Sequence, residues 1–255
     1  MNSQTYFLDA FVSKTTEGNP AAVVALQKWI DEREMQEIAH ANNLAETAFF
    51  VPEGNKFGLR WFTPTSEVDL CGHATLATAH VIFKNLISSS DVIHFSTKSG
   101  VLAVSKDMDL LTLDLPGRRV AACRPTPVLL ECFNKPPMMV LESGNGTYIA
   151  VFENEDEISH FKPDFNKISK IDRCLNITAP GNDCDFVSRF FGPNLGLGED
   201  PVTGSAHCGL AIYWARRLNR SYPLHAKQLS QRGGELYCEV RGDRVRISGL
   251  VRYSF

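Results

Sequence analysis

The sequence has no membrane-length apolar run, no excess of basic residues and no paired cysteine motif. Its wholly apolar runs, such as Ala21–Leu26, fall far short of the about 18–20 residues that a membrane-spanning helix requires. Lys and Arg number 26 against 29 Asp and Glu, so the net charge of −3 argues against binding to a nucleic-acid backbone. The first residues lack a basic region followed by a long apolar region, so no signal peptide is predicted. Seven cysteines without a CxxC pair predict a reducing, cytoplasmic compartment and no disulfide framework.

Motifs for common cofactors and metals are also missing. The chain contains neither GxGxxG nor a Walker lysine, so no dinucleotide or P-loop nucleotide is expected. It has no HExxH, and Cys71-x-His73 and His207-Cys208 lack the spacing of a structural zinc site. Val187-Ser188-Arg189 is not the GxSxG of a hydrolase. No cofactor and no metal are therefore expected, and the chemistry must come from side chains and backbone groups.

Strand-like and helical segments alternate along the 255 residues, of which 44% are apolar, and this predicts a globular α+β protein. Two apolar helices are expected at Ala74–Lys84 and Ala206–Leu218. The principal expected strands are Thr5–Phe11, Ala21–Leu26, Glu46–Val51, Leu59–Thr63, His94–Thr97, Val101–Ser105, Leu110–Leu115, Met138–Leu141, Tyr148–Phe152, Asp185–Phe191, Leu236–Val240 and Val245–Ile247.

A break near the midpoint and an internal repeat predict two domains. Asp114-Leu115-Pro116-Gly117 interrupts the pattern, so the expected halves are residues 1–117 and 118–255. Phe62-Thr63-Pro64 precedes the first apolar helix, and Phe191-Gly192-Pro193 precedes the second in the same order. A chance match of short motifs is the alternative. The shared order of strand, proline, glycine and helix favours two related halves, each wrapped around one central helix.

A glycine lies two residues before each predicted helix, in Gly72-His73-Ala74 and in Gly204-Ser205-Ala206, at the expected turn from strand to helix. The first N–H groups of a helix lack intrahelical partners and carry the positive end of its dipole, which suits a carboxylate or phosphate. We therefore predict that these two helix starts bind the anionic part of a substrate. The alternative is that each glycine only permits a tight turn from strand to helix.

Glu46 is a lone carboxylate at the start of an apolar strand. Desolvation there would let it both accept and donate a proton near neutral pH, although a solvent-facing strand glutamate is the simpler alternative. His73 either orients a substrate and shuttles a proton or serves in capping and packing. Asp200 or its neighbour Glu199 either binds a substrate hydroxyl or amine or only complements the positive end of the helix.

Cys71 precedes the first helix, where the helix N-terminus lowers a thiol pKa and favours a nucleophile. Its counterpart in the second half is Thr203, so a mechanism with two thiols is not supported. Ser205 either donates its hydroxyl to an anion or caps the second helix.

Six ordered segments resemble the PhzF-like family of phenazine-biosynthesis isomerases, from about residue 8 to the final strands. They are Gly18–Val23, Leu44–Phe49, Leu59–Pro64, Cys71–Thr75, Asp185–Phe191 and Glu199–Ala206. The resemblance implies the diaminopimelate-epimerase-like fold. Two pseudo-symmetric halves, each a β-sheet rolled around a central helix, would flank the active site, and the final strand would cross back to the first half.

The resemblance also implies roles for individual residues. Glu46 would be the single acid/base, with His73 and Asp200 as further catalytic residues and Ser205 at an anion site formed by Gly72, His73, Gly204 and Ala206. The predicted function is a cofactor-independent isomerase that moves a proton on a small carboxylate-bearing metabolite. The alternative is a non-catalytic member of the same fold that binds a small molecule or a protein. The expected partner is a small anionic substrate, without nucleic acid or membrane, and a homodimer stays open.

Overall fold

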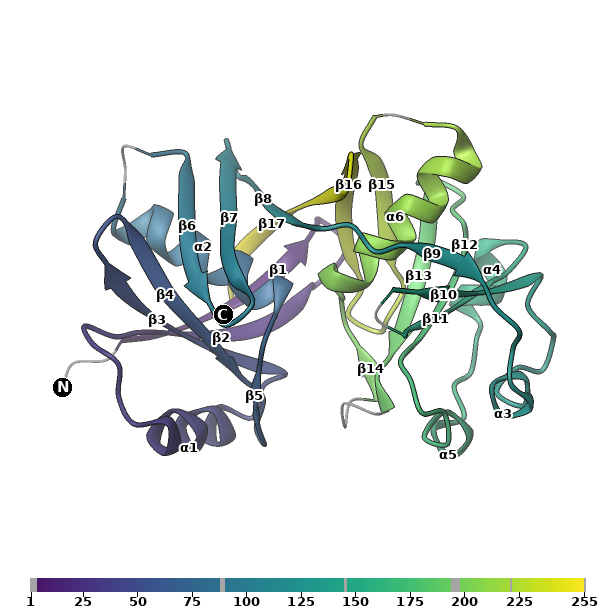
Figure 1. The fold of residues 1–255 in the computed structure, drawn as a ribbon, viewed down its shortest axis with the longest axis horizontal. Coiled ribbons are helices and arrows are strands. Elements are labelled where there is room, and N and C mark those ends of the chain that lie inside the picture. The colour runs from purple at the N-terminus through teal and green to yellow at the C-terminus, as the bar shows by residue number, and fades with distance from the viewer. Residues whose placement is uncertain (1–3, 88–89, 145, 194–197, 221, 255) are drawn as a thin grey trace. The chain divides into compact units, whose positions relative to one another are not determined.

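The computed structural model describes every residue except 1–3, 88–89, 145, 194–197, 221 and 255. The chain is an α+β protein that divides into two compact units (Figure 1). Unit 1 contains the residues up to Asp114 and those from Ser248 onward, and unit 2 contains Leu115–Ile247. The first boundary therefore lies close to the expected residue 117. The second unit ends at Ile247 and not at residue 255, because the last strand returns to unit 1.

Unit 1 is a set of strands around one central helix. Its strands are β1 (Gln4–Val12), β2 (Asn19–Ala25), β3 (Glu46–Glu53), β4 (Lys56–Phe62), β5 (Glu67–Val68), β6 (Val92–Thr97), β7 (Gly100–Asp107) and most of β8 (Leu110–Pro116), and its helices are α1 (Glu32–Asn42) and α2 (Gly72–Asn85). The central helix α2 packs against β1, β2 and β3. The peripheral helix α1 begins after Asp31, whose side chain accepts a hydrogen bond from the Arg33 N–H and so caps the helix.

The central helix α2 is apolar on nearly all sides, which is the pattern of a helix buried in a protein core. Its polar members are satisfied locally, since Thr75 donates its hydroxyl proton to the Cys71 carbonyl and Thr78 to the Ala74 carbonyl. The helix begins at Gly72, two residues before the predicted start, so the glycine belongs to its first turn.

Unit 2 repeats this organisation around α6. Its strands are β9 (Val120–Ala122), β10 (Met139–Ser143), β11 (Tyr148–Val151), β12 (Leu175–Pro180), β13 (Phe186–Phe191), β14 (Glu199–Asp200), β15 (Leu224–Gln228), β16 (Gly234–Arg241) and the start of β17 (Arg244–Tyr253), and its helices are α3 (Pro127–Leu130), α4 (Glu155–Ser159), α5 (Phe165–Ile168) and α6 (Gly204–Leu218). Of these strands, β9, β12, β14 and β15 were not predicted. In β12 the polar Asn176 and Thr178 are buried together with the apolar residues, so the usual alternation of a half-exposed strand is missing.

The two units share one order of strand pairings, which identifies them as related halves. In unit 1, β1–β2 is antiparallel, β2–β3 parallel, β3–β4 antiparallel, β4–β6 parallel and β6–β7 antiparallel. In unit 2, β10–β11, β11–β12, β12–β13, β13–β15 and β15–β16 follow the same sequence of directions. A short strand precedes the central helix in each case, β5 before α2 and β14 before α6.

Two strands carry the chain between the units. The strand β8 starts in unit 1 and ends at Pro116 in unit 2, and β17 starts in unit 2 and ends in unit 1. In unit 1, β17 pairs antiparallel with β1, with Ala10 opposite Val251 and Leu8 opposite Tyr253. Gly249 lies against the Phe11 ring so closely that an added Cβ would overlap it.

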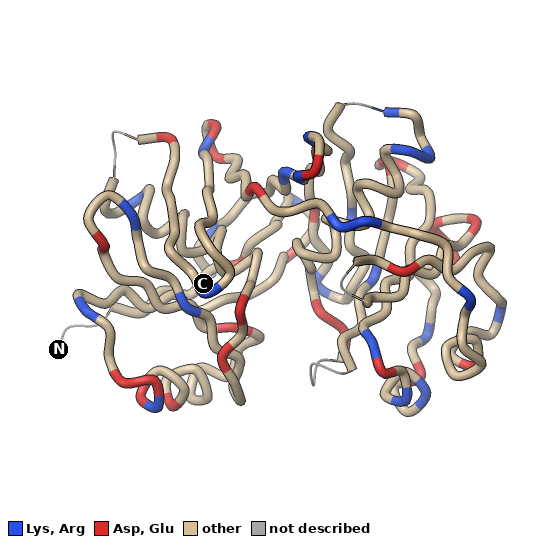
Figure 2. The backbone as a smooth tube through the Cα atoms, in the orientation of Figure 1, with Lys and Arg blue, Asp and Glu red and all other residues tan. Residues whose placement is uncertain are grey.

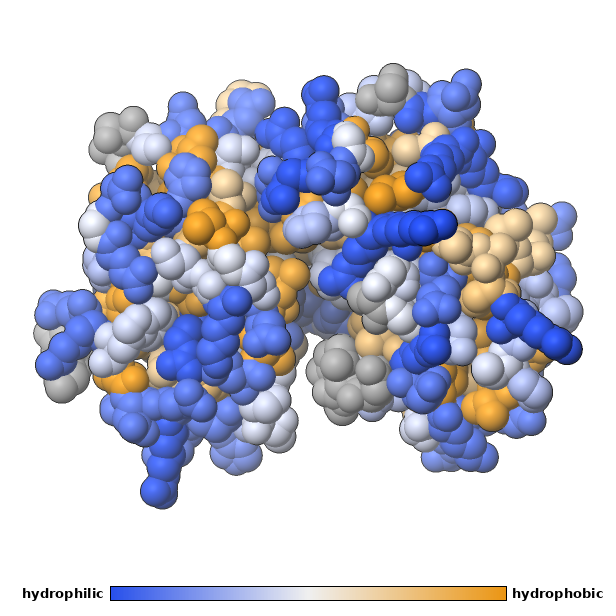
Figure 3. Space-filling model, viewed as in Figure 1, coloured by the Kyte–Doolittle hydropathy of each residue, from blue (hydrophilic) through white to orange (hydrophobic). Residues whose placement is uncertain are grey.

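Charged residues of both signs are interspersed along the described chain of each unit (Figure 2). On the face drawn in Figure 3, apolar residues lie scattered among hydrophilic ones. Among the described helices, none combines the length and apolar character that crossing a bilayer requires.

Candidate active site

Glu46 is the first residue of β3, where it lies opposite Ala21 of the parallel strand β2. Its side chain is 13% exposed, and its Oε2 lies 3.2 Å from Nε2 of His73. This oxygen is buried and accepts no hydrogen bond of good geometry from the described residues, so its contact with His73 is chiefly electrostatic. The predicted base is thus largely desolvated and faces a single imidazole.

His73 is the second residue of α2 and lies between Glu46 and a buried amide. Its Nδ1 lies 3.2 Å from Nδ2 of Asn19, which is fully buried on β2. Because an amide nitrogen donates, this contact places the proton of a neutral imidazole on Nε2, toward Glu46. Burial lowers the pKa of His73, but the neighbouring Cys71 and Glu46 outweigh it and raise that pKa well above its usual value.

Cys71 completes this group from the position before α2. Its Sγ lies 3.5 Å from Nδ1 and 3.9 Å from Nε2 of His73. Burial, and then the charge of Glu46, raise the pKa of the Cys71 thiol, although His73 acts in the opposite direction. The lowered thiol pKa expected from the helix start is therefore outweighed, and Cys71 is a thiol near neutral pH.

The starts of α2 and α6 both lack a side-chain cap and an acidic residue in the first turn. Cys71 and Thr203 occupy the N-cap positions without a capping hydrogen bond from their side chains, and neither first turn contains an acidic residue. Gly72 and Gly204 are buried, Ser205 is half-buried and Ala206 is 9% exposed. The positive end of each helix dipole is thus left without a protein carboxylate in its own first turn.

Asp200 lies at the end of β14 and is held by the residues that lead into α6. Thr203 donates its hydroxyl proton to Oδ2 of Asp200 over 2.5 Å. Gln228, on β15, donates through Nε2 to the Asp200 carbonyl over 2.7 Å and to the Thr203 hydroxyl over 3.2 Å. Its Oε1 accepts from the Thr203 N–H over 2.9 Å. Thr203, the counterpart of Cys71, therefore supports a carboxylate in unit 2.

An ion pair holds Glu199, the residue that precedes Asp200 on β14. Arg189, on β13, donates through Nε and Nη2 to the two carboxylate oxygens of Glu199, over 2.6 and 2.8 Å. Its Nη1 donates to the Phe161 carbonyl over 2.6 Å. Glu199 is thus engaged in a structural ion pair, which leaves Asp200 as the candidate for contact with a substrate.

His207 lies one turn into α6 and is fully buried. Its Nδ1–H donates to the Thr203 carbonyl over 2.8 Å, and its Nε2 finds no hydrogen-bond partner among the described residues. Burial lowers the pKa of His207 to about 4. The imidazole is therefore neutral and helps to order the first turn of α6.

Among the residues that the structure describes, two groups of side chains bring metal-ligating atoms together. In unit 1, Glu46, Cys71 and His73 place one ligand atom each within 4.8 Å of one another, and in unit 2 Glu155, Asp183 and Cys184 do so. All seven cysteines of the chain lie in its described part and are free thiols.

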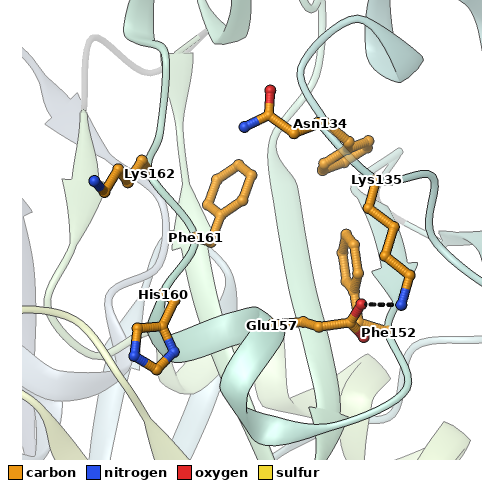
Figure 4. A pocket seen from close by; sticks show the side chains of 8 residues that line it. Asn134, Lys135, Phe152, Glu157, His160, Phe161 and Lys162 are labelled. Atoms are coloured by element: carbon orange, nitrogen blue, oxygen red, sulfur yellow. Dashed lines mark ion pairs between the residues drawn. The ribbon is translucent and has the colours of Figure 1, made fainter.

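A separate pocket of about 270 Å³ in unit 2 contains none of the predicted site residues. Figure 4 shows its aromatic side chains, Phe152 and Phe161, beside a paired Lys135 and Glu157. Because Lys135 Nζ lies 2.5 Å from Glu157 Oε1, these charges neutralise each other. The pocket also contains His160 and Lys162, and its one carboxylate, Glu157, is engaged in this ion pair.

The chain matches the family model described as phenazine biosynthesis-like protein, PhzC-PhzF, over residues 8–252. It belongs to this family. It is 46% identical to a Pseudomonas aeruginosa protein named an uncharacterized isomerase, over 98% of this chain and 95% of that one. It is 35% identical to the human phenazine biosynthesis-like domain-containing protein, over 98% of this chain and 96% of that one.

Solved structures show the same fold. A PhzF-family protein of Enterococcus faecalis superposes with a TM-score of 0.95 at 42% identity, covering 100% of this chain and 98% of that chain. A hydroxyproline epimerase of Agrobacterium vitis superposes with a TM-score of 0.62 at 10% identity, covering 100% and 90%. The fold expected from the sequence, that of the PhzF proteins and related epimerases, is thereby confirmed.

The structure brings together some predicted site residues and adds others. Glu46 and His73 are in contact in unit 1, where Gly72 begins α2. In unit 2, Gly204, Ser205 and Ala206 lie in the first turn of α6, and Asp200 lies at the end of β14. Sequence reasoning missed the three side chains that hold these groups, Asn19, Arg189 and Gln228. Asn19 and Arg189 lie within family-like segments, but no local pattern marked Gln228.

Proposed function

We propose that the chain is a cofactor-independent isomerase that moves a proton on a small carboxylate-bearing metabolite, with Glu46 as the single acid/base. The observation that carries this proposal is the buried Oε2 of Glu46 beside Nε2 of His73. Relatives named as isomerases, and the epimerase fold, support an isomerase kind of activity.

In the proposed reaction, Glu46 removes a proton from a carbon next to a carboxylate or in an allylic position. The electron pair of the broken C–H bond moves into the conjugated carboxylate, and the proton returns to a different carbon. The N–H groups at the starts of α2 and α6 would bind the substrate carboxylate and stabilise the charge that develops on it. His73 and Asp200 would orient polar substituents, and Ser205 would donate to the anion.

Replacing Glu46 by Gln tests this mechanism. Gln keeps the size and hydrogen-bonding capacity of the side chain but cannot carry the proton, so catalysis should fall by about 10²–10⁴-fold while the protein stays folded. The measurement is deuterium incorporation from D₂O into a panel of small unsaturated and amino-substituted carboxylic acids, followed by NMR. Glu53→Gln, at the exposed end of the same strand, is the matched control and should exchange like the wild type.

Two results would oppose the proposal. If Cys71→Ala abolishes deuterium exchange while Glu46→Gln leaves it intact, the thiol is the acid/base. If the wild type binds carboxylic acids from the panel without any deuterium incorporation, the chain is a non-catalytic binding protein of this fold. The proposed mechanism expects only a small effect of Cys71→Ala, because Thr203 stands where a second thiol would be needed.

A further inference from the structure

Three different ligand types meet at the start of α2, although the sequence separates them. The motif Cys71-x-His73 supplies only two ligands at an unusual spacing, and Glu46 arrives from β3. The Nε2 of His73 lies 3.2 Å from Glu46 Oε2 and 3.9 Å from Cys71 Sγ. Thiolate, imidazole and carboxylate are the ligand types that proteins use for zinc.

The distances approach those that a single zinc ion requires. Bonds of about 2.3 Å to sulfur and about 2.0–2.1 Å to nitrogen or oxygen, in tetrahedral geometry, place the ligand atoms about 3.3–3.6 Å apart. The nitrogen–oxygen pair, at 3.2 Å, is slightly closer than this range, and the nitrogen–sulfur pair, at 3.9 Å, is slightly wider. Side-chain rotation of Cys71 would close the remaining gap and leave a fourth position for water or another ligand.

The charge balance also suits a buried ion. Zn²⁺ with one thiolate, one carboxylate and one neutral imidazole has no net charge, which limits the cost of burying it. Binding would release the thiol proton of Cys71 and the Nε2 proton of the His73 imidazolium to solvent, so that Nε2 is open to the metal and Nδ1 keeps its proton. The side chain of Asn19, which already contacts Nδ1, can turn its amide oxygen toward that proton, accept a hydrogen bond from it and so orient the imidazole.

The other group of potential ligands is less suitable. Asp183 is paired with Lys227 at 2.6 Å, and Glu155 accepts a hydrogen bond from the Asn182 N–H over 2.7 Å. Asp183 is also exposed to solvent, so water would weaken its electrostatic attraction to a bound cation. A metal would have to displace an existing cation at this position.

We infer that Glu46, Cys71 and His73 bind one zinc ion, which reversibly blocks the carboxylate that performs the proton transfer. Zinc on Oε2 occupies the atom that would otherwise accept the substrate proton. Thiophilic divalent cations would thus regulate the site by occupying it. The blocking role rests on the proposed function, whereas the binding of zinc does not.

Titration of the metal-free full chain with Zn²⁺ by calorimetry, and with Co²⁺ by absorbance, tests the site. We expect one ion per chain and, with Co²⁺, a thiolate-to-metal charge-transfer band. Because loss of a second-shell partner alone costs about 10–100-fold in affinity, Cys71→Ser, His73→Asn and Glu46→Gln should each weaken binding by at least about 100-fold. Cys123→Ser, which alters a partly exposed thiol in unit 2, is the control and should bind like the wild type.

The outcomes separate this inference from the proposed function. Absence of stoichiometric binding to the wild type, or loss of binding in Cys184→Ser and not in Cys71→Ser, overturns the zinc site. If Glu46→Gln abolishes deuterium exchange but the wild type binds no zinc, the acid/base role holds and the metal site falls. If zinc binds as described, the control Cys123→Ser should show deuterium exchange that zinc inhibits and a chelator restores. Exchange that continues unchanged with zinc bound would overturn the blocking role.

Discussion

His73 and His207 lie near the starts of α2 and α6, yet their surroundings shift their pKa values in opposite directions. His73 is flanked by a carboxylate and a thiol, which raise its pKa despite burial. His207 has a backbone carbonyl on Nδ1 and an apolar environment elsewhere, with the Phe186 ring centred 5.8 Å away. The same residue type therefore faces ionisable groups in one unit and packs against an aromatic ring in the other.

His207 should make the protein sensitive to acid. Its folded pKa of about 4 lies below the unfolded value of about 6.5, so its contribution to stability is fully present above pH 6.5 and is lost as the pH falls toward 4. The loss should reach about 3 kcal/mol in the free energy of unfolding at the acidic end. Urea unfolding measured between pH 7.5 and 4 gives this free energy.

The comparison of two variants isolates this contribution. His207→Asn retains a donor toward the Thr203 carbonyl but cannot be protonated, so its stability should fall less steeply between pH 6.5 and 4 than that of the wild type. His94→Asn, at an exposed position on β6, should retain the wild-type slope. Equal slopes in all three proteins would show that His207 does not titrate as described.

At the level of elements, each central helix starts where a short strand ends, and the turn between them needs outside support. In unit 2 that support is Gln228, which is 1% exposed and makes three hydrogen bonds to the segment between Asp200 and Thr203. In unit 1 the corresponding region is held by contacts of Asn19 and His73. The strands adjacent to each helix therefore fix the geometry of its first turn.

Gln228→Leu should destabilise unit 2 by at least about 2 kcal/mol, because it leaves the buried Thr203 N–H and the Asp200 carbonyl without their partner. Hydrogen exchange of the Thr203 amide should also accelerate. Gln228→Glu keeps the acceptor for Thr203 N–H but loses the donor toward Asp200, so it should protect that amide better than Leu does. Gln36→Leu, which removes one half-buried hydrogen bond to the Thr63 carbonyl, is the control and should cost less. If the Thr203 amide of Gln228→Leu exchanges as slowly as that of the wild type, Gln228 does not support this turn.

At the level of the whole molecule, β8 and β17 each contribute residues to both units. A strand that is shared in this way transmits instability, because melting its pairings in one unit frees the part of the same strand that the other unit uses. Unfolding of the two units should therefore be coupled, in contrast to domains that are joined by a flexible linker.

Gly249→Ala tests this coupling. The added methyl group would overlap the Phe11 ring in unit 1, and such overpacking costs about 1–3 kcal/mol. We expect faster hydrogen exchange, measured by mass spectrometry, in β1 of unit 1 and also in β16 of unit 2. Leu250→Ala, at a 40% exposed position of the same strand, should change little. Faster exchange confined to unit 1 would show that the units unfold independently.

Much of the fold follows from local sequence patterns. The apolar helices, most strands and the repeat are carried by periodicity and by glycine and proline positions. The prediction missed β12 and β15, and also the short strands β5, β9 and β14. The reason in β12 is that the polar residues Asn176 and Thr178 are buried in a strand covered on both faces. Polar residues therefore do not mark an exposed face of this strand, and the alternating pattern of a half-exposed strand is missing.

The sequence by itself determined the family, the two related halves and the residue types that could move a proton. These features depend on local spacing and on ordered motifs, which are properties of the linear chain. Only the tertiary structure decided that Glu46 meets His73 and Cys71, and that Thr203 and Gln228 hold Asp200. Those contacts join residues on different elements through strand register and helix packing, which depend on the whole core and not on neighbours in sequence.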